Sequence, residues 1–356
     1  MSAIMECPSR EEYGRCIELA AQRVPNASQF EGKTFFITGA SGMVGGALCR
    51  TLLYLDRTLK LGLKLVLPVR SEASKGKLSG IYGRDCVKVF TADPESEIDI
   101  AENIDYIVHA ASPTDSFTLK QQSADALRSI VLGGLSALEL ARRKRLESMV
   151  YLSSMEVYGT LAGAATEDSA GAIDLTSPRS CYPEGKRLIE NACACYAAQY
   201  GVNACSARLA QVMSAGIKPG ENRAYAQFAK SALKGEDITL KTTGASSGNY
   251  VHIADAVSAI LTLLVKGEKG QSYNVCGDGC TLTIKELALR ISAILSRGQS
   301  RVVIDAPNDP SLLPYAPETG IVLVNEKLRR LGWQSVFGID DMIKSLGADL
   351  SELMAV

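Results

Sequence analysis

Short apolar runs alternate with longer amphipathic segments along the first half of the chain. Lys33–Thr38 (KTFFIT) is typical of a buried strand, and the apolar spacing from Val44 to Leu61 predicts a helix after it. Further strands are predicted at Leu63–Val69, Cys86–Thr91, Tyr106–Ala110 and Met149–Leu152, and a long helix at Ser123–Arg143. Short buried strands joined by helices are typical of a parallel sheet, so the pattern predicts an α/β doubly wound fold.

Both ends of the chain depart from this alternation. Glu11–Val24 has helical spacing and Pro25 ends it, so we expect residues 1–30 to form a helical extension. From about Gly216, glycine, proline and polar residues increase, as in the segments 215–223, 242–250 and 306–320, with strands still predicted at Tyr250–Ile253 and Gln271–Val275. We therefore expect a main domain of residues 31–210 plus 248–277, a smaller lobe of residues 211–247 plus 278–356, and a cleft between them.

Composition excludes several classes of function. The 356 residues include 38 basic and 39 acidic side chains, and this net charge of −1 gives no electrostatic reason to bind nucleic acid or an anionic membrane. The apolar run Val257–Val265 is too short to cross a bilayer, and the first residues lack a signal-peptide pattern, so we expect a cytoplasmic protein. The ten cysteines are poorly spaced for metal ligation, and His109 and His252 neighbour neither close cysteine pair, so we expect reduced thiols and no metal site.

A glycine-rich turn, TGASGMVG at residues 38–45, directly follows the first predicted strand and opens the first helix. Glycine permits a tight turn and lets the backbone approach a pyrophosphate, while the helix N-terminus offers free N–H groups and the positive end of its dipole. In this strand–turn–helix context the motif predicts a Rossmann-like dinucleotide site. The turn residues that we expect at the cofactor are Gly39, Ser41, Gly42, Met43, Val44 and Gly45.

The end of the second strand should distinguish between the two nicotinamide dinucleotides. NAD sites usually place an acid there for the ribose hydroxyls, whereas an arginine accommodates the additional phosphate of NADP. Arg70 at this position favours NADP, and Glu72 is the nearest acid that would favour NAD. The cofactor is therefore predicted as NAD or NADP.

Three further motifs accompany the glycine turn: DYIVHAAS at residues 105–112, YLSSMEVYG at 151–159 and YPEGK at 182–186. From about Lys33 to about Trp333 the chain resembles the extended short-chain dehydrogenase/reductase family, specifically its NAD-dependent epimerase/dehydratase group of nucleotide-sugar enzymes. The resemblance implies a nucleotide-sugar substrate, and a homodimer formed through Ser123–Arg143 and Tyr182–Gln199. It also implies cofactor contacts by Asp93, Ala110, Ala111 and Ser112.

Tyr182 and Lys186 form the predicted catalytic pair. They stand four residues apart on one predicted helix, so an ammonium can lie near a phenol. Together with the positive nicotinamide, this cation would favour the phenolate and lower its pKa from about 10. Tyr182 would then take the proton of a sugar 4-hydroxyl while hydride leaves C4 for the nicotinamide. The resemblance also implies that Lys186 holds the nicotinamide ribose, that Tyr182 touches the cofactor, and that Ser154 hydrogen-bonds the reacting oxygen.

Glu156 is the residue that distinguishes reactions within the family. The 4,6-dehydratases carry Asp-Glu here, whereas this chain has Met155 before Glu156, and a thioether cannot act as a general acid. The UDP-glucuronate decarboxylases have a small residue before the glutamate and a helix start very like residues 179–187 (RSCYPEGKR). This match favours decarboxylation of a UDP-uronic acid through a 4-keto intermediate, with 4-epimerisation or 4,6-dehydration as alternatives.

Two hypotheses of other classes remain, an NADP-dependent carbonyl reductase and a non-catalytic cofactor-binding protein. Glu156 would then be a solvated loop acid.

On the substrate side, relatives place a diphosphate-binding arginine where this chain has Gly248, and Arg223 is the candidate to replace its charge. The substrate contacts that the resemblance implies, with Gln211 in place of the family's asparagine, are Ser112, Ser154, Arg208, Gln211 and Arg223.

Overall fold

The computed structural model describes residues 10–78, 80–81, 83–93, 95–218, 220–306 and 320–355. Residues 1–9 of the predicted extension, and most of the predicted loop 306–320, lie outside the described residues.

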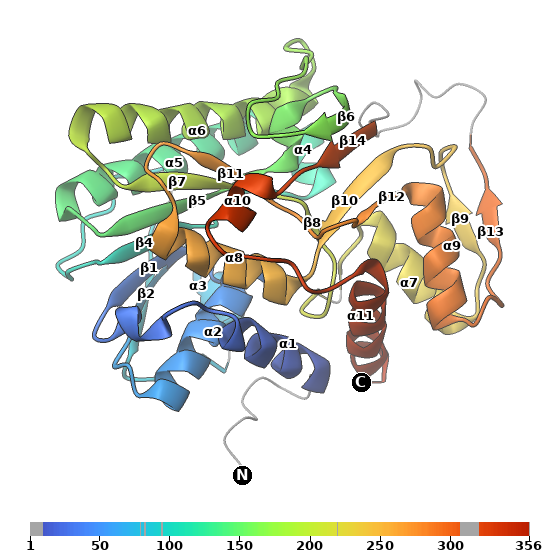
Figure 1. The fold of residues 1–356 in the computed structure, drawn as a ribbon, viewed down its shortest axis with the longest axis horizontal. Helices are drawn as coiled ribbons and strands as arrows, with labels where there is room; N and C mark the ends of the chain where they lie inside the picture. Colours follow the sequence, from blue (N-terminus) through green and yellow to red (C-terminus); the bar gives the residue numbers. More distant parts are fainter. Residues whose placement is uncertain are drawn as a thin grey trace.

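A seven-stranded parallel sheet lies at the centre of the main domain (Figure 1). Its strand order is β11-β7-β5-β4-β1-β2-β3, so the chain runs from β1 to one edge and then returns to β4 on the other side. The carboxyl ends of β1 and β4 therefore flank the crevice where ligands bind in folds of this kind. The strands are β1 (Thr34–Thr38), β2 (Lys64–Val69), β3 (Val87–Thr91), β4 (Tyr106–His109), β5 (Ser148–Ser154), β7 (Ala204–Leu209) and β11 (Ser272–Val275).

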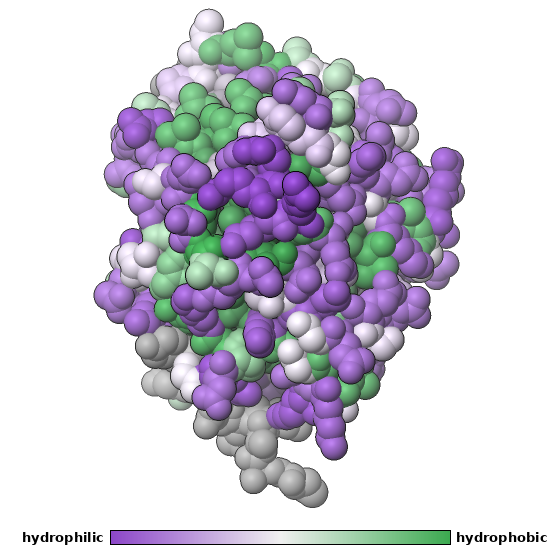
Figure 2. Space-filling model, turned by 90° about the vertical axis from the view of Figure 1, so that its left-hand side faces the viewer, coloured by the Kyte–Doolittle hydropathy of each residue, from purple (hydrophilic) through white to green (hydrophobic). Residues whose placement is uncertain are grey.

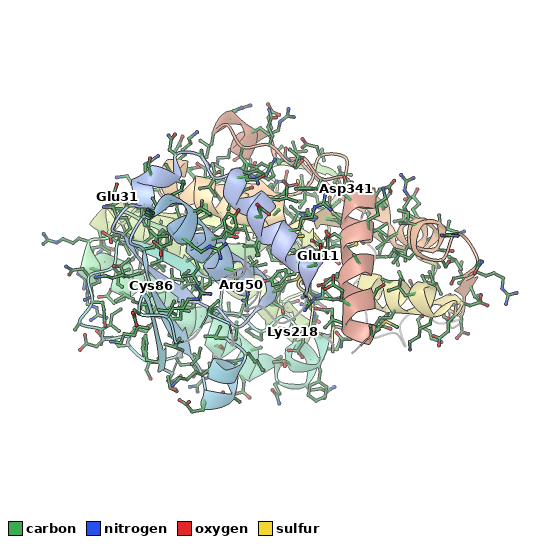
Figure 3. All side chains as sticks on the ribbon, turned by 90° about the horizontal axis from the view of Figure 1, so that it is seen from below. Glu11, Glu31, Arg50, Cys86, Lys218 and Asp341 are labelled. Carbon is green, nitrogen blue, oxygen red and sulfur yellow. The ribbon has the colours of Figure 1, made fainter. Side chains whose placement is uncertain are left out.

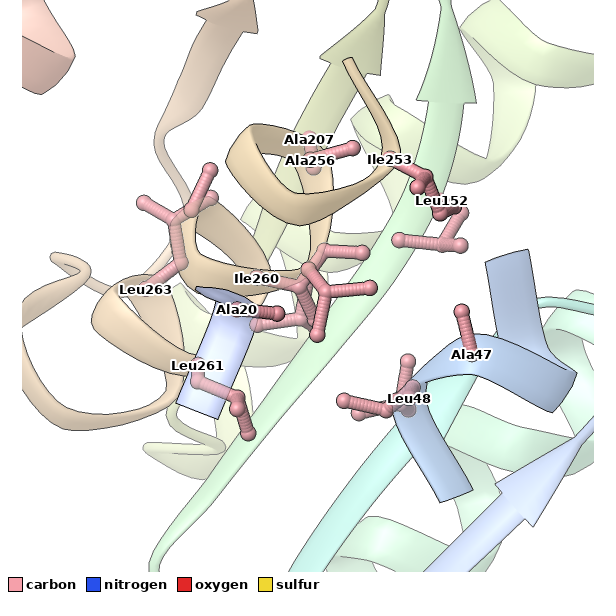
Figure 4. Close-up of a cluster of buried hydrophobic side chains, with 14 of the residues drawn as sticks. Ala20, Ala47, Leu48, Leu152, Ala207, Ile253, Ala256, Ile260, Leu261 and Leu263 are labelled. Carbon is pink, nitrogen blue, oxygen red and sulfur yellow. The ribbon is translucent and has the colours of Figure 1, made fainter. Parts of the chain in front are cut away.

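Helices cover both faces of this sheet, which confirms the predicted doubly wound α/β fold. Helices α5 (Ser123–Lys144) and α6 (Cys181–Tyr200) lie on one face, and α2 (Met43–Leu59) and α8 (Ile253–Lys266) lie on the other (Figure 1). Successive strand residues point to opposite faces, so Phe35 and Phe36 of β1 enter different cores. Figure 4 shows the core on the α8 side, where Leu48, Leu152 and Ile260 come together from α2, β5 and α8.

The C-terminal lobe has its own core between helices α7 (Ala224–Lys234), α9 (Ile284–Leu295) and α11 (Ile339–Met354). The strand predicted at Tyr250–Ile253 forms as β10 (Ser247–Val251), but it pairs with β8 (Gln211–Val212) and β12 (Thr281–Thr283) rather than with the large sheet. It ends before Ile253 because His252 caps α8, its Nδ1 accepting the N–H of Ala254 at 3.2 Å. The remaining elements are η1 (Ala27–Phe30), α3 (Glu72–Gly76), α4 (Ser116–Gln121), η2 (Met155–Tyr158), β6 (Ala162–Ala165), η3 (Pro178–Ser180), β9 (Ile238–Leu240), β13 (Val302–Ile304), β14 (Gly320–Leu323) and α10 (Glu326–Arg330).

The described part of the extension forms helix α1 (Glu11–Gln22), which packs against α2 and α8 and contacts α11 at its N-terminal end (Figure 3). Just before the helix, Arg10 pairs with the buried carboxylate of Asp349 on α11. Just after it, Arg23 pairs with the buried Asp255 of α8 at 3.1 Å. Charged contacts therefore join α1 to both parts of the molecule.

Within the described ranges, the helices are all too short or too polar to cross a membrane. The cysteines described there are free thiols, and the same residues include no group of three or more His, Cys, Asp or Glu side chains suited to a metal ion.

Candidate active site

The turn between β1 and α2 brings backbone segments so close together that side chains are excluded. Gly39 has a φ of +69°, and a Cβ there would lie 2.6 Å from the carbonyl of Ala110. A Cβ at Gly45 would lie 2.4 Å from the carbonyl oxygen of Gly39. Gly42 at the N-cap of α2 has no side-chain oxygen to satisfy the first helical N–H groups, which suits the turn to an anionic ligand.

A cavity of about 570 Å³ extends from this turn across the carboxyl ends of the central strands. This volume is in the usual range of ligand sites. The C-terminal lobe closes one wall through Lys218 and Arg223. The predicted cofactor residues that line the cavity are Gly39, Ser41, Gly42, Met43, Arg70, Asp93, Ala110, Ala111 and Ser112, whereas Val44, Gly45, Tyr182 and Lys186 do not line it.

A hydrogen-bonded pair, Thr38 and His109, fixes the two strand ends beneath the cavity. The Thr38 hydroxyl accepts the N–H groups of Ala110 and Ala111, both at 3.1 Å, and lies 3.1 Å from Nδ1 of His109. Because both lone pairs of the hydroxyl oxygen are used, the hydroxyl must donate a hydrogen bond to Nδ1. Nδ1 is then the acceptor nitrogen of the ring, which assigns the imidazole proton to Nε2. Burial, with a contribution from Lys186, lowers the pKa of His109 to about 3, so the ring is neutral and structural.

Tyr182 and Lys186 both lie on the buried side of α6, with 7% and 3% of their surface exposed. Lys186 Nζ donates a hydrogen bond to the carbonyl of Leu152 at 2.7 Å and lies 5.6 Å from the centre of the Tyr182 ring. In the chain by itself, burial, followed by Glu156, raises the pKa of Tyr182 to about 12, so the lowering expected from Lys186 together with the nicotinamide remains a prediction for the cofactor-bound enzyme. The same burial lowers the pKa of Lys186 to about 7.

Glu156 is not simply a solvated acid. It lies in η2 directly after β5, where its N–H donates to the Ser154 hydroxyl at 3.2 Å. One guanidinium nitrogen of Arg179 donates to both of its carboxylate oxygens, at 2.8 and 3.0 Å. The Arg179 guanidinium also lies 5.7 Å from the centre of the Tyr182 ring, and its charge opposes the effect of Glu156 on the phenol pKa.

Arg179 was not among the predicted site residues, although it stands three positions before Tyr182 in the same motif. Its contact with Glu156, 23 positions away, depends on how η2 and η3 pack. In the sequence, Arg179 is a single arginine in a predicted loop. The spacing of residues along the chain does not indicate that it contacts Glu156.

Three predicted substrate residues do not line the main cavity, and they are Ser154, Arg208 and Gln211. Arg208 on β7 pairs with Glu190 of α6 at 2.7 Å and donates to the Tyr158 hydroxyl at 2.9 Å. It lines a separate cavity of about 320 Å³. Gln211, on β8, pairs in register with Tyr250 on β10 and lines neither cavity. The structure therefore brings Ser112 and Arg223 to the main cavity and Ser154 to Tyr182, but it does not bring Arg208 and Gln211 there.

The position of the family's arginine is filled by another side chain. A Cβ at Gly248 would lie 2.3 Å from the hydroxyl of Tyr250, which stands two residues later on the same face of β10. A larger residue at 248 would have to displace this buried tyrosine. Arg223 lines the cavity instead, held at 3.3 Å by Glu221 and at 3.1 Å by the Tyr225 hydroxyl.

Comparison with known proteins agrees with this geometry. The family model described as the NAD dependent epimerase/dehydratase family matches residues 35–276. The chain belongs to this family. It is thus an NAD(P)-dependent enzyme of the nucleotide-sugar-modifying epimerase/dehydratase family, and the glycine turn and its cavity fit the dinucleotide.

Among similar family members, UDP-glucuronic acid decarboxylase 6 of Arabidopsis thaliana is 26% identical over 277 residues, covering 77% of this chain and 78% of the relative. An epimerase from Methanothermobacter thermautotrophicus has a similar structure, with a TM-score of 0.76 and 20% identity over 95% of this chain and 96% of that one. A UDP-glucuronic acid 4-epimerase from Bacillus cereus, solved with UDP-glucuronic acid and NAD, has a TM-score of 0.74 and 18% identity over 90% and 99%.

Proposed function

We propose that this family member decarboxylates a UDP-uronic acid through a 4-keto intermediate. The observation that carries the proposal is Glu156 held by Arg179 beside Tyr182, with Met155 at the position where a dehydratase needs an acid. The similarity to UDP-glucuronic acid decarboxylases supports the same reaction.

In this proposal Tyr182 removes the proton from the 4-hydroxyl of the sugar, and Ser154 orients that oxygen. A bound nicotinamide dinucleotide would supply the hydride acceptor. Because burial keeps the phenol protonated in the chain by itself, Tyr182 needs positive charge nearby to give up its proton. Arg179 and Arg223 already act in that direction, and Lys186 lies within reach of the ring.

Loss of CO2 from a 4-keto uronic acid leaves the bonding electron pair on C5 as an enolate, which then takes a proton from solvent. The hydride would then return from the reduced nicotinamide to C4, and the proton held by Tyr182 would return to the 4-oxygen, so the cofactor is recycled. Such a substrate must bring its carboxylate close to Glu156 without being repelled. The ion pair with Arg179 offsets the charge of Glu156 and allows this approach. We infer that Glu156 and Arg179 act as a unit, with the arginine positioning the acid.

Mass spectrometry of products tests the proposal directly. Incubation with UDP-glucuronate and either NAD or NADP should yield a product that has lost CO2. Loss of water from a nucleotide hexose would instead identify a dehydratase. Stoichiometric consumption of NADPH by a small carbonyl compound would identify a reductase, and cofactor binding with no turnover of UDP-glucuronate would overturn the proposal.

Epimerisation at C4 is the second candidate, and the structural similarity to the Bacillus cereus UDP-glucuronic acid 4-epimerase favours it. The same 4-keto intermediate serves both reactions, so the two differ in whether the carboxylate leaves. A product of unchanged mass whose NMR spectrum shows inversion at C4 would establish the epimerase and reject decarboxylation.

A homodimer through α5 and α6 remains a prediction, as does the cytoplasmic location. These helices pack against each other and expose Leu127, Leu132 and Leu188. Figure 2 shows the end of the molecule on the left of Figure 1 as mostly hydrophilic, with hydrophobic side chains gathered in patches. Sedimentation of the purified chain tests the dimer.

A further inference from the structure

We propose that the ribose end of the main cavity is built for the 2′-phosphate of NADP, and that this enzyme binds NADP in preference to NAD. The proposal rests on the family's dinucleotide site and not on the choice of decarboxylation. It also goes beyond the sequence motif, because the structure shows which charged groups near the end of β2 are available to a ligand.

Arg70 is the first of these groups. It directly follows β2, which pairs with β1 and therefore ends beside the glycine turn. Its side chain is exposed and lines the cavity. Across the described ranges of the chain, no hydrogen bond or ion pair engages this guanidinium. A free arginine can meet a phosphate with two parallel hydrogen bonds.

The nearby acids are occupied elsewhere. Glu72, the acid that would favour NAD, accepts the Thr91 hydroxyl at 3.1 Å, lies 3.6 Å from Lys75, and does not line the cavity. Asp93 does line the cavity, but its oxygens accept the N–H of Glu95 at 3.0 Å and the hydroxyl of Ser96 at 2.9 Å. Both carboxylates already accept local hydrogen bonds, and only Asp93 lines the cavity, whereas an acid in an NAD site binds the ribose 2′-hydroxyl.

The opposite wall adds positive charge. Lys218 lines the cavity, and its pKa is lowered by burial and by repulsion from Lys77 and Arg223, although Glu221 on the same wall opposes this effect. Lys77 lies directly after α3, the helix that follows Arg70. The hydroxyl of Ser74, on the same helix, also lines the cavity. Cations that repel one another around a cavity favour an anion between them, and the 2′-phosphate is the group by which NADP differs from NAD.

The test is cofactor binding by the full-length chain, measured by calorimetry after bound nucleotide has been removed. NADP⁺ should bind at least about tenfold more tightly than NAD⁺. Arg70→Gln should weaken NADP⁺ binding by about tenfold or more and change NAD⁺ binding by less than about twofold. Arg330→Gln, at an exposed arginine of α10, is the matched control and should change neither. Mass spectrometry of nucleotide released from freshly purified protein should identify NADP.

Equal or tighter binding of NAD⁺ by the unmodified chain would overturn the proposal. So would an Arg70→Gln variant that loses both cofactors to the same extent, because the arginine would then contact something that the two share. Binding of neither nucleotide would reject the cavity as the cofactor site. No sugar substrate is present, so a chain that prefers NADP but does not decarboxylate UDP-glucuronate would reject the proposed reaction alone.

Discussion

The two ends of the candidate active site are built in different ways. At the cofactor end, backbone groups form the surface: Gly39 and Gly45 exclude side chains, and Arg70 is exposed with no partner among the described residues. At the catalytic end, side chains hold one another, with Tyr182 and Lys186 buried and Glu156 paired with Arg179. The first end is ready to receive an anion, whereas the second is neutralised internally and needs bound ligands to become reactive.

Replacing the Tyr182 phenol should abolish the function of the catalytic end and leave cofactor binding unchanged, which is the largest expected difference between the two ends. Tyr182→Phe removes the acid–base group and should lower kcat by about 10³-fold or more. Because Tyr182 does not line the main cavity, the affinity for NAD⁺ and NADP⁺ should stay within about twofold. Initial rates and calorimetry measure the two effects, and full activity of the variant would overturn the catalytic role of Tyr182.

A methyl group in the glycine turn should instead weaken cofactor binding. In Gly45→Ala the added Cβ would lie 2.4 Å from the Gly39 carbonyl oxygen, so the turn must shift. Overpacking of this kind costs about 1–3 kcal/mol, which predicts cofactor binding weaker by about 5- to 150-fold. Gly14→Ala is the control, because a Cβ at Gly14 in α1 meets nothing within 4 Å. Equal cofactor affinity in the two variants would contradict the close approach.

Loss of Arg179 should sharpen the comparison at the catalytic end. In Arg179→Ala the charge of Glu156 is no longer offset, so the pKa of Tyr182 should rise and the substrate carboxylate should be repelled. We expect a KM for UDP-glucuronate about tenfold higher and a kcat–pH profile shifted to higher pH, with partial recovery in Arg179→Lys.

A matched control for that variant is Arg290→Ala, which breaks the exposed pair with Asp340 at 2.6 Å. It should leave both KM and the pH profile unchanged. If Arg179→Ala lowers activity without moving either one, the arginine supports only the local fold.

The last effect concerns stability rather than activity and rests on His109, which lies between the two ends. Its pKa is about 3 in the folded chain and about 6.5 when unfolded, so the unfolded chain binds more protons between these pH values. Stability is therefore lost as the pH falls through this range, by up to about 1.4 kcal/mol per pH unit. His109→Asn, which retains a partner for Thr38, should reduce the fall in the free energy of unfolding with decreasing pH, measured by urea unfolding at pH 7, 6, 5 and 4. An unchanged slope would contradict the buried neutral state.

The cofactor end could be predicted from the sequence because its physics is local. Consecutive residues dictate the strand, the glycine turn and the helix start, and the position of Arg70 follows from the strand end. The catalytic end depends on partners that are distant in sequence. The pairing of Glu156 with Arg179, the diversion of Arg208 to Glu190 and the filling of the Gly248 position by Tyr250 each result from packing. Residue spacing predicted Tyr182 and Lys186 as a pair, but it could not show that burial raises the pKa of the phenol in the chain by itself.

Helix α1 has a consequence for the order in which the molecule is made. It leaves the ribosome early, yet Arg10 pairs with Asp349, 339 positions later, and Cys16 contacts Ser345, 329 positions later. Contacts of such high sequence separation close late, and domains otherwise fold in the order of synthesis. The apolar face of α1 can find all of its partners only when translation is nearly complete. Helix α1 can therefore pack against α2 early, but its docking is completed only after α11 has been made.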